Sequence, residues 1–259
     1  MGVPTLGCEC AVCTSADPHD RRLRPSALIR WHEEGREGGR ERIVVIDTGP
    51  DFREQALRTG LRRLDAVLYT HSHADHIFGL DDLRPLSFLI AQQGADLPLY
   101  AGATTRKVIE HVFDYTFSPN ATYPNRARVQ LHDLGAGVEI HGVRFGRVPV
   151  MHGQAEIAGF RFGATAYLTD VSNIPESSFP LLEGVDTLVL SALRHKPHAT
   201  HATIEQAVAW AQRIGARQTW FTHISHDLGH EATNRTLPDG IRLAYDGLSV
   251  PIRLDLETR

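Results

Sequence analysis

Residues 64–76 read LDAVLYTHSHADH, and this stretch decides how the rest of the chain is interpreted. The apolar run Leu64–Tyr69 predicts a buried strand. The turn after it carries four side chains of the metal-binding kind within six residues: His71, His73, Asp75 and His76. Imidazole nitrogens and carboxylate oxygens suit zinc, iron or manganese, and side chains in a loop can serve two adjacent ions. The stretch therefore predicts the catalytic centre of a metal-dependent hydrolase.

Four ligands cannot complete a site for two metal ions, so other parts of the chain must supply more. Three further strand-like runs end in a suitable side chain: His152, Asp170 and His223. One histidine or aspartate at a strand end is usually a capping or surface residue. Because this chain also has a complete metal run, the three residues together predict additional ligands. Asp170 is well placed to bridge two cations.

All three cysteines lie in one short segment, at Cys8, Cys10 and Cys13. An odd number of closely spaced cysteines argues against disulfides and favours metal or redox chemistry. Three thiolates need a fourth ligand for a tetrahedral zinc ion, and His226, three residues after His223, is the candidate. Residues 2–13 therefore predict a structural zinc loop, with free thiols or a redox sensor as the alternatives.

The remaining pattern predicts an α/β fold in one domain over residues 1–259, with two sheets inside helical layers. A polar, glycine-rich segment at 33–40 predicts a hairpin loop. Thr203 and Gln206 fit a capping box, and Gly215 fits the end of the helix that they begin. Helices are expected at 51–58, 104–115 and 203–214, and strands at 26–31, 42–46, 64–69, 97–101, 129–131, 138–140, 143–150, 159–162, 164–169, 187–191 and 218–222.

The His71–His76 run with His152, Asp170 and His223 resembles the ligand set of the metallo-β-lactamase superfamily. The resemblance implies an αββα sandwich with the ligands on loops along one edge of the two sheets. It implies that one ion is held by His71, His73 and His152, the other by Asp75, His76 and His223, and both by Asp170. An aspartate at the bridging position is similar to the phosphodiesterase and hydrolase branches, whereas β-lactam-cleaving members often have a cysteine there.

The N-terminal pattern GVPxxGCxCxxC and the loop Thr222–His226 resemble the PhnP-type phosphodiesterases. Residues 198–203 and 244–247 are similar to that family as well, so the resemblance covers nearly the whole chain. It implies hydrolysis of phosphoribosyl 1,2-cyclic phosphate. Members usually begin with a strand before the GVP segment, and this sequence begins at Met1, so we expect an exposed sheet edge.

The resemblance implies a histidine near the scissile bond, and we assign that role to His201, with His195 and His198 as rivals. His201 is expected to protonate the leaving oxygen or to donate a hydrogen bond to the phosphate. Asp75 is assigned to the catalytic set in addition to its role as a ligand. Asp47 is expected to accept a hydrogen bond from a ligand histidine, the alternative being a turn-forming aspartate.

The expected cofactors are two divalent catalytic ions, Mn²⁺ or Zn²⁺, and one structural Zn²⁺. The net charge of −4 means that acidic residues outnumber basic ones, which disfavours nucleic acid as a partner. No apolar run approaches the length of a membrane span and no signal-peptide pattern begins the sequence, so a cytoplasmic location is expected. The expected partner is a small-molecule phosphodiester, and a homodimer is compatible with the sequence.

Several other functions fit the same ligands. They are a nuclease, a cyclic-nucleotide phosphodiesterase, a thioester or lactone hydrolase, and a non-catalytic carrier resembling the pyrroloquinoline quinone biosynthesis protein. Two complete metal triads argue against the carrier, because a carrier has little need of them.

Overall fold

The computed structural model describes residues 2–33, 39–120 and 122–254. The chain divides into two compact units, which are described separately: unit 1 contains Met1–Arg24 and Val143–Arg259, and unit 2 contains Pro25–Gly142. The expected single domain over 1–259 stays a prediction. Most of the predicted hairpin loop at 33–40 lies outside the described residues.

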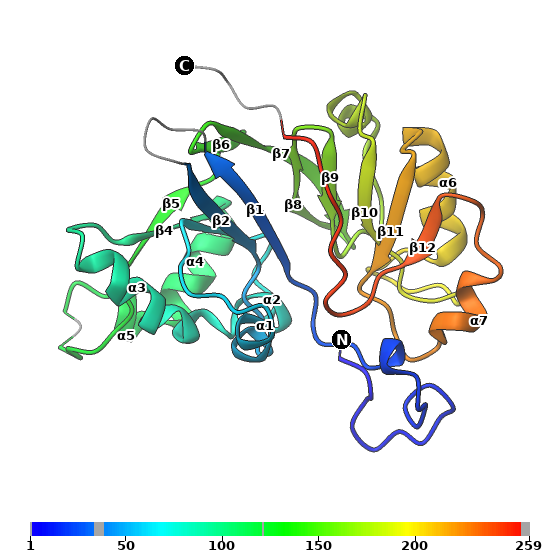
Figure 1. The fold of residues 1–259 in the computed structure, drawn as a ribbon, viewed down its shortest axis with the longest axis horizontal. Helices are drawn as coiled ribbons and strands as arrows, with labels where there is room; N and C mark the ends of the chain where they lie inside the picture. Colours follow the sequence, from blue (N-terminus) through cyan, green and yellow to red (C-terminus); the bar gives the residue numbers. More distant parts are fainter. Residues whose placement is uncertain (1, 34–38, 121, 255–259) are drawn as a thin grey trace. The chain divides into compact units, whose positions relative to one another are not determined.

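Unit 2 is built on a five-stranded sheet of order β1-β2-β3-β4-β5 (Figure 1). Its strands are β1 (Ala27–Glu33), β2 (Arg40–Ile46), β3 (Ala66–Leu68), β4 (Leu97–Ala101) and β5 (Val129–Asp133). β1 and β2 are antiparallel, and β2 to β5 are parallel to one another. Parallel strands are covered on both faces, which explains why residues 43–46 are apolar without alternation and are all buried.

The helices of unit 2 include a segment where the sequence predicts no helix. Residues 81–89 instead form the end of η2 (Leu80–Leu83) and most of α3 (Arg84–Ala91), where Pro85 fits the first turn of a helix. The helix expected at 104–115 is two helices that meet at the buried Phe113. The full set is α1 (Phe52–Arg58), α2 (Ala74–Ile77), η2, α3, α4 (Ala103–Val112) and α5 (Asp114–Phe117), and β6 (Gly137–Ile140) ends the unit.

Unit 1 contains strands in the order β12-β11-β10-β9-β8-β7. They are β7 (Val143–His152), β8 (Ala155–Phe162), β9 (Thr165–Leu168), β10 (Thr187–Ser191), β11 (Gln218–Thr222) and β12 (Ile241–Leu243). β9 to β12 are parallel, and β7, β8 and β9 are antiparallel. The parallel arrangement brings the carboxyl ends of β9, β10 and β11 to one edge of the sheet, and Asp170 and His223 follow two of these ends.

The helices of unit 1 are η1 (Pro18–Asp20), η3 (Glu176–Leu182), α6 (Ile204–Ile214) and α7 (His230–Asn234). The prediction for α6 is confirmed: Thr203 and Gln206 form the capping box, and Gly215 ends the helix in the left-handed conformation. The buried face of α6 packs into a core with apolar residues of β9, β10 and β11. None of the helices in the described ranges is long and apolar enough to cross a membrane.

Candidate metal centre

Three of the singled-out side chains follow strand ends in an unusual backbone conformation. Asp47 follows β2 with φ 61°, Asp170 follows β9 with φ 57°, and His223 follows β11 with φ 53°. The left-handed region costs a residue other than glycine about 1 kcal/mol or more, so the surrounding structure must hold it there. Strain of this kind is characteristic of functional sites, because it turns a side chain out of the direction that the strand would give it.

Asp47 organises the metal run of unit 2. Its carboxylate is fully buried and accepts three hydrogen bonds: from the Thr70 backbone N–H at 2.8 Å, the Thr70 hydroxyl at 2.7 Å and His76 Nδ1 at 2.7 Å. Because a carboxylate only accepts, His76 Nδ1 must carry the proton, which leaves Nε2 as its metal-binding nitrogen. The expected hydrogen bond to Asp47 from a histidine of the metal run is confirmed.

The Thr70 hydroxyl extends this network to His71. Its proton goes to Asp47, so its oxygen accepts from His71 Nδ1 at 3.0 Å. His71 therefore also presents Nε2 as its metal-binding nitrogen. One buried carboxylate thus sets the tautomer of two histidines, directly for His76 and through Thr70 for His71.

The short helix α2 holds the other donors of the run. His73 is its N-cap and Asp75 lies in its first turn, while the His71 ring lies 4.6 Å from that of His73 and 4.1 Å from that of His76. The helix is anchored to the turn after β2, because Thr48 N–H donates to the His76 carbonyl. Gly79 permits this approach: a Cβ there would lie only 2.1 Å from the Gly49 carbonyl oxygen.

The strand ends of unit 1 provide a second set of donors. His152 Nδ1 donates to the Thr200 carbonyl at 2.7 Å, which leaves its Nε2 for a metal ion. Asp170 Oδ1 accepts from the Thr169 hydroxyl at 2.8 Å, and Asp170 Oδ2 lies 3.4 Å from His223 Nε2. All three donors are buried. A histidine fixed by its far nitrogen and a carboxylate facing a second histidine are the arrangement that a divalent cation requires.

His201 lies among these donors. It can place a ligand atom within 4.8 Å of those of Asp170 and His223, and its ring lies 4.7 Å from the rings of His152 and His223. Burial, followed by the positive charge that His223 can carry, lowers the pKa of His201 to about 3, although the negative charge of Asp170 opposes the shift. The imidazole is therefore neutral near pH 7, able to donate a hydrogen bond from an N–H but holding no extra proton to transfer.

The two rivals of His201 are placed differently. His195 is exposed and donates a hydrogen bond from Nδ1 to Glu205 at 2.7 Å on the surface. His198 is exposed and accepts from the Thr200 backbone N–H at 3.2 Å, while its ring lies 5.0 Å from that of His201. Of the three, His201 is the one that lies against the unit 1 donors.

The third donor cluster joins the N-terminal segment of unit 1 to the loop that follows β11. The sulfur atoms of Cys8, Cys10 and Cys13 lie 3.2, 3.7 and 3.4 Å from His226 Nδ1. The four ligand atoms lie within 4.8 Å of one another, a Cys₃His set that fits a tetrahedral zinc ion. The Cys13 backbone N–H points at the Cys10 sulfur and lowers the pKa of Cys10 to about 7, which favours the thiolate that zinc requires.

The predicted ligands thus fall into an intact Cys₃His cluster and two histidine–carboxylate sets, one in each unit. The assignment of seven ligands to two ions stays a prediction. Sequence reasoning missed Thr70 and the Thr200 carbonyl, which orient His71 and His152. A backbone carbonyl carries no residue-type signal, although a threonine directly before the metal run is visible in the sequence.

Replacing Asp47 by asparagine tests its network. The amide offers one acceptor where the carboxylate accepts from His76 and twice from Thr70, so we expect divalent-ion affinity to fall about 10- to 100-fold. The readout is metal binding by competition with a chelator. Asp96→Asn, at an exposed position of the same unit, is the control. Unchanged affinity in Asp47→Asn would show that Asp47 does not orient the ligands.

Replacing Cys10 by serine tests the Cys₃His cluster. A serine hydroxyl is a poor zinc ligand, so the variant should lose about one zinc ion per chain and unfold at a lower temperature. Metal analysis and thermal denaturation measure both effects. Glu9→Gln, exposed between Cys8 and Cys10, should change neither. A full zinc complement in Cys10→Ser would refute the structural zinc ion.

The low pKa of His201 predicts a pH effect on the metal-free chain. The unfolded chain takes up a proton at this histidine near pH 6.5, whereas the folded chain does so only near pH 3. The unfolded state therefore binds more protons in this window, and the free energy of unfolding falls as the pH falls below 6.5. Denaturant unfolding at pH 7.5 and 5.5 should show a smaller loss in His201→Gln than in the parent or in His195→Gln. Equal losses in all three would contradict the buried, neutral imidazole.

Comparisons with known proteins agree with the fold. The chain is 53% identical to a protein whose structure is described as a new diphosphatase from the PhnP family, with a TM-score of 0.89 over 99% of this chain and 95% of that one. Zinc-bound PqqB from Methylobacterium extorquens shares the fold, with 21% identity and a TM-score of 0.70 over 97% and 96% of the two chains.

Curated relatives carry varied names. An octanoyltransferase of Porphyromonas gingivalis is 36% identical over 97% of this chain, but this chain spans only 49% of that protein, about half its length. A ribonuclease Z of Mycobacterium bovis is 28% identical over 82% of this chain and 83% of its own.

Residues 42–224 match the family described as beta-lactamase superfamily domain, and this segment contains all seven expected ligands of the two-ion centre. The expected fold class is confirmed, an α/β fold with two sheets of the metallo-β-lactamase type. The chain belongs to the beta-lactamase superfamily, and nearly its whole length is similar to the PhnP family within it.

Proposed function

We propose that this protein is a two-metal phosphoesterase that hydrolyses a small phosphodiester, such as phosphoribosyl 1,2-cyclic phosphate. The observation that carries the proposal is the environment of Asp170. This buried carboxylate, held in a left-handed turn at the end of β9, faces His223 and lies beside His201. A carboxylate so placed suits a bridge between two cations, as the family resemblance implies, and a cation pair suits phosphoryl chemistry.

Two divalent ions at this centre would supply a hydroxide nucleophile at neutral pH and neutralise charge on the phosphate oxygens. His71, His73 and His152 would hold one ion, Asp75, His76 and His223 the other, and Asp170 both. His152 and His76 are already oriented for this task by the Thr200 carbonyl and by Asp47. The Cys₃His cluster would hold a structural zinc ion outside the reaction.

His201 is the proposed catalytic side chain of the chain itself. Its neutral ring would donate an N–H to the departing oxygen or to a phosphate oxygen. Its Nδ1 is buried and makes no hydrogen bond within residues 2–33, 39–120 and 122–254. A ring nitrogen without a hydrogen bond to the described protein groups, 4.0 Å from Asp170 Oδ2, is suited to contact a substrate held beside that carboxylate.

A diphosphate ester is the second candidate substrate, because the 53% identical relative is described as a diphosphatase. Both reactions break a phosphorus–oxygen bond, so the same donors serve either. A ribonuclease activity, suggested by the ribonuclease Z relative, has weaker support because the chain carries a net charge of −4. The carrier alternative is supported by the similarity of the fold to PqqB. At 21% identity, however, this similarity concerns the fold alone.

A substrate panel separates these functions. Purified protein loaded with Mn²⁺ is assayed on bis-(p-nitrophenyl) phosphate, then on phosphoribosyl 1,2-cyclic phosphate and on a nucleoside diphosphate sugar. We expect hydrolysis of the first compound and of one of the other two. A protein that binds the ions and cleaves none of the three would contradict the proposal and favour the carrier.

Replacing Asp170 by asparagine tests the site directly. Loss of the negative charge between the two ions should lower kcat by more than about a hundredfold, because it removes a ligand itself rather than its support. Asp239→Asn, exposed in the same unit, should leave kcat unchanged. Full activity in Asp170→Asn would remove this carboxylate from the proposed centre.

A further inference from the structure

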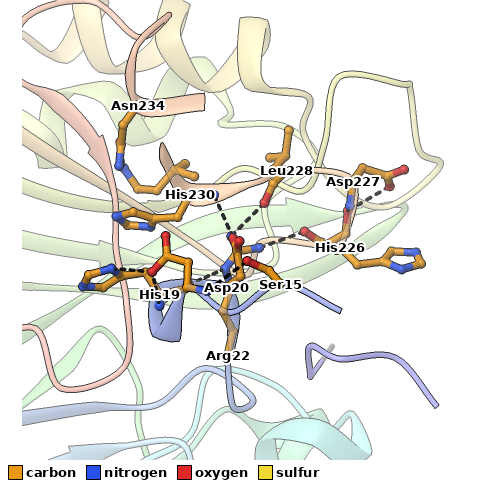
Figure 2. Close-up of polar contacts among 12 residues, drawn as sticks. Ser15, His19, Asp20, Arg22, His226, Asp227, Leu228, His230 and Asn234 are labelled. Carbon is orange, nitrogen blue, oxygen red and sulfur yellow. Dashed lines mark hydrogen bonds and ion pairs between the residues drawn. The ribbon is translucent and has the colours of Figure 1, made fainter. Parts of the chain in front are cut away.

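Arg22 is a buried cation that joins segments more than two hundred residues apart in sequence (Figure 2). Its side chain makes four hydrogen bonds. Nε donates to the His19 carbonyl at 3.2 Å, Nη1 to the Ser225 carbonyl at 3.0 Å, and Nη2 to the Leu228 carbonyl at 2.7 Å and to Asp20 at 3.0 Å. The residue is only 6% exposed. The planar fork of a guanidinium is the group that can hold two separate carbonyls at fixed spacing.

Asp20 is the counter-ion of Arg22 and a second link to the same region. It is 7% exposed, and its Oδ1 also accepts the His230 backbone N–H at 2.8 Å, at the start of α7. Burial lowers the pKa of Arg22, while the negative charges of Asp20, Asp246 and Asp17 oppose that shift. Taking an ion pair out of water is costly, and apolar side chains often stabilise a fold equally well. The directional hydrogen bonds are therefore the feature that apolar side chains could not replace.

The two ends of Arg22 hold the two halves of the Cys₃His cluster. Its backbone exchanges hydrogen bonds with Val3, at 2.8 and 2.9 Å, where the loop with Cys8, Cys10 and Cys13 begins. Its guanidinium binds the carbonyls of Ser225 and Leu228, which flank His226 on either side. The distance between the cysteine loop and the histidine loop is thus defined by one side chain as well as by the cluster itself.

The histidine loop also carries His223, a ligand of the proposed catalytic centre. Ser225, whose carbonyl accepts from Arg22, donates its own N–H to the Leu193 carbonyl at 3.0 Å. Leu193 in turn bonds to Ala202, next to His201, at 3.0 Å. His223 therefore lies between β11 and a turn to which Arg22 donates hydrogen bonds, and its left-handed backbone conformation requires the surrounding structure to hold it.

We propose that Asp20 and Arg22 form a positioning pair, which couples the Cys₃His cluster to the catalytic centre by fixing the turn that carries both His226 and His223. The inference rests on the proposed function for the identity of the catalytic centre. Neither residue is among the expected metal ligands or the proposed catalytic side chains. The pair acts through the carbonyls of Ser225 and Leu228 and through the His230 N–H.

The test compares Arg22→Met, Arg22→Lys and Asp20→Asn with the control Arg21→Met, whose arginine is exposed next to Arg22. Each protein is loaded with Co²⁺. The absorption band of cobalt bound to thiolate reports the Cys₃His cluster alone. Competition with a chelator reports the affinity of the ions held by histidine and carboxylate.

For Arg22→Met we expect the thiolate band to persist while the affinity of the histidine–carboxylate centre falls more than about tenfold. Arg22→Lys should lie between Arg22→Met and the parent, because an ammonium can reach one carbonyl but cannot fork to two. Asp20→Asn should shift affinity in the same direction, and it serves as the test if Arg22→Met does not fold. Arg21→Met should match the parent.

An affinity within about threefold of the parent in all Arg22 and Asp20 variants would overturn the proposal. So would loss of the thiolate band with an unchanged histidine–carboxylate centre, because the pair would then serve only the zinc loop. Neither readout uses a substrate. If the parent binds the ions but cleaves no phosphoester, the proposed function fails while the positioning test still stands.

Discussion

The buried carboxylate of Asp47 is the interaction on which the metal run of unit 2 depends. It has no exposed surface, and a carboxylate in such a place must be fully hydrogen-bonded to be tolerated. Thr70 and His76 meet that demand, and meeting it fixes which nitrogen of His76 faces a metal ion. The left-handed turn at Asp47 brings the carboxylate back toward the end of β3, where the run begins. The strained backbone of Asp47, the burial of its carboxylate and the orientation of His76 are therefore linked through the same hydrogen bonds.

In unit 1, different groups orient the side chains that are expected to bind metal. His152 is oriented by a backbone carbonyl, Asp170 by the neighbouring Thr169 hydroxyl, and His223 by its position between β11 and the turn at Ser225. These are the outer-shell contacts that a metal centre needs for its ligands to be in place before the ion arrives. The neutral His201 completes the set, since a protonated ring there would repel the cations that the other side chains attract.

Much of this could be predicted from the sequence because the signals are local. β4, β10 and β11 have the bounds that their apolar runs predict, and the capping box and terminal glycine of α6 lie where expected. The cysteine spacing and the strand-end donors could also be found, because a donor that follows an apolar run is visible in the sequence. The hydrogen bond that Asp47 accepts from His76 could be predicted because Asp47 also follows an apolar run.

The rest depends on contacts between distant segments, which no local pattern shows. No helix is predicted at residues 81–89, yet they form helix because Leu80 and Leu83 are buried in the core of unit 2. The helix expected at 104–115 is interrupted where Phe113 turns into that core. Arg22 looked like one of many arginines, and only the fold brings Ser225 and Leu228 to it.

The most direct measurement is the anomalous X-ray scattering of crystals of the metal-loaded protein, recorded at the absorption edges of zinc and manganese. The account predicts a pair of ions bridged by Asp170 and a separate zinc ion between Cys8, Cys10, Cys13 and His226. A loaded crystal with no ion at Asp170 would contradict it.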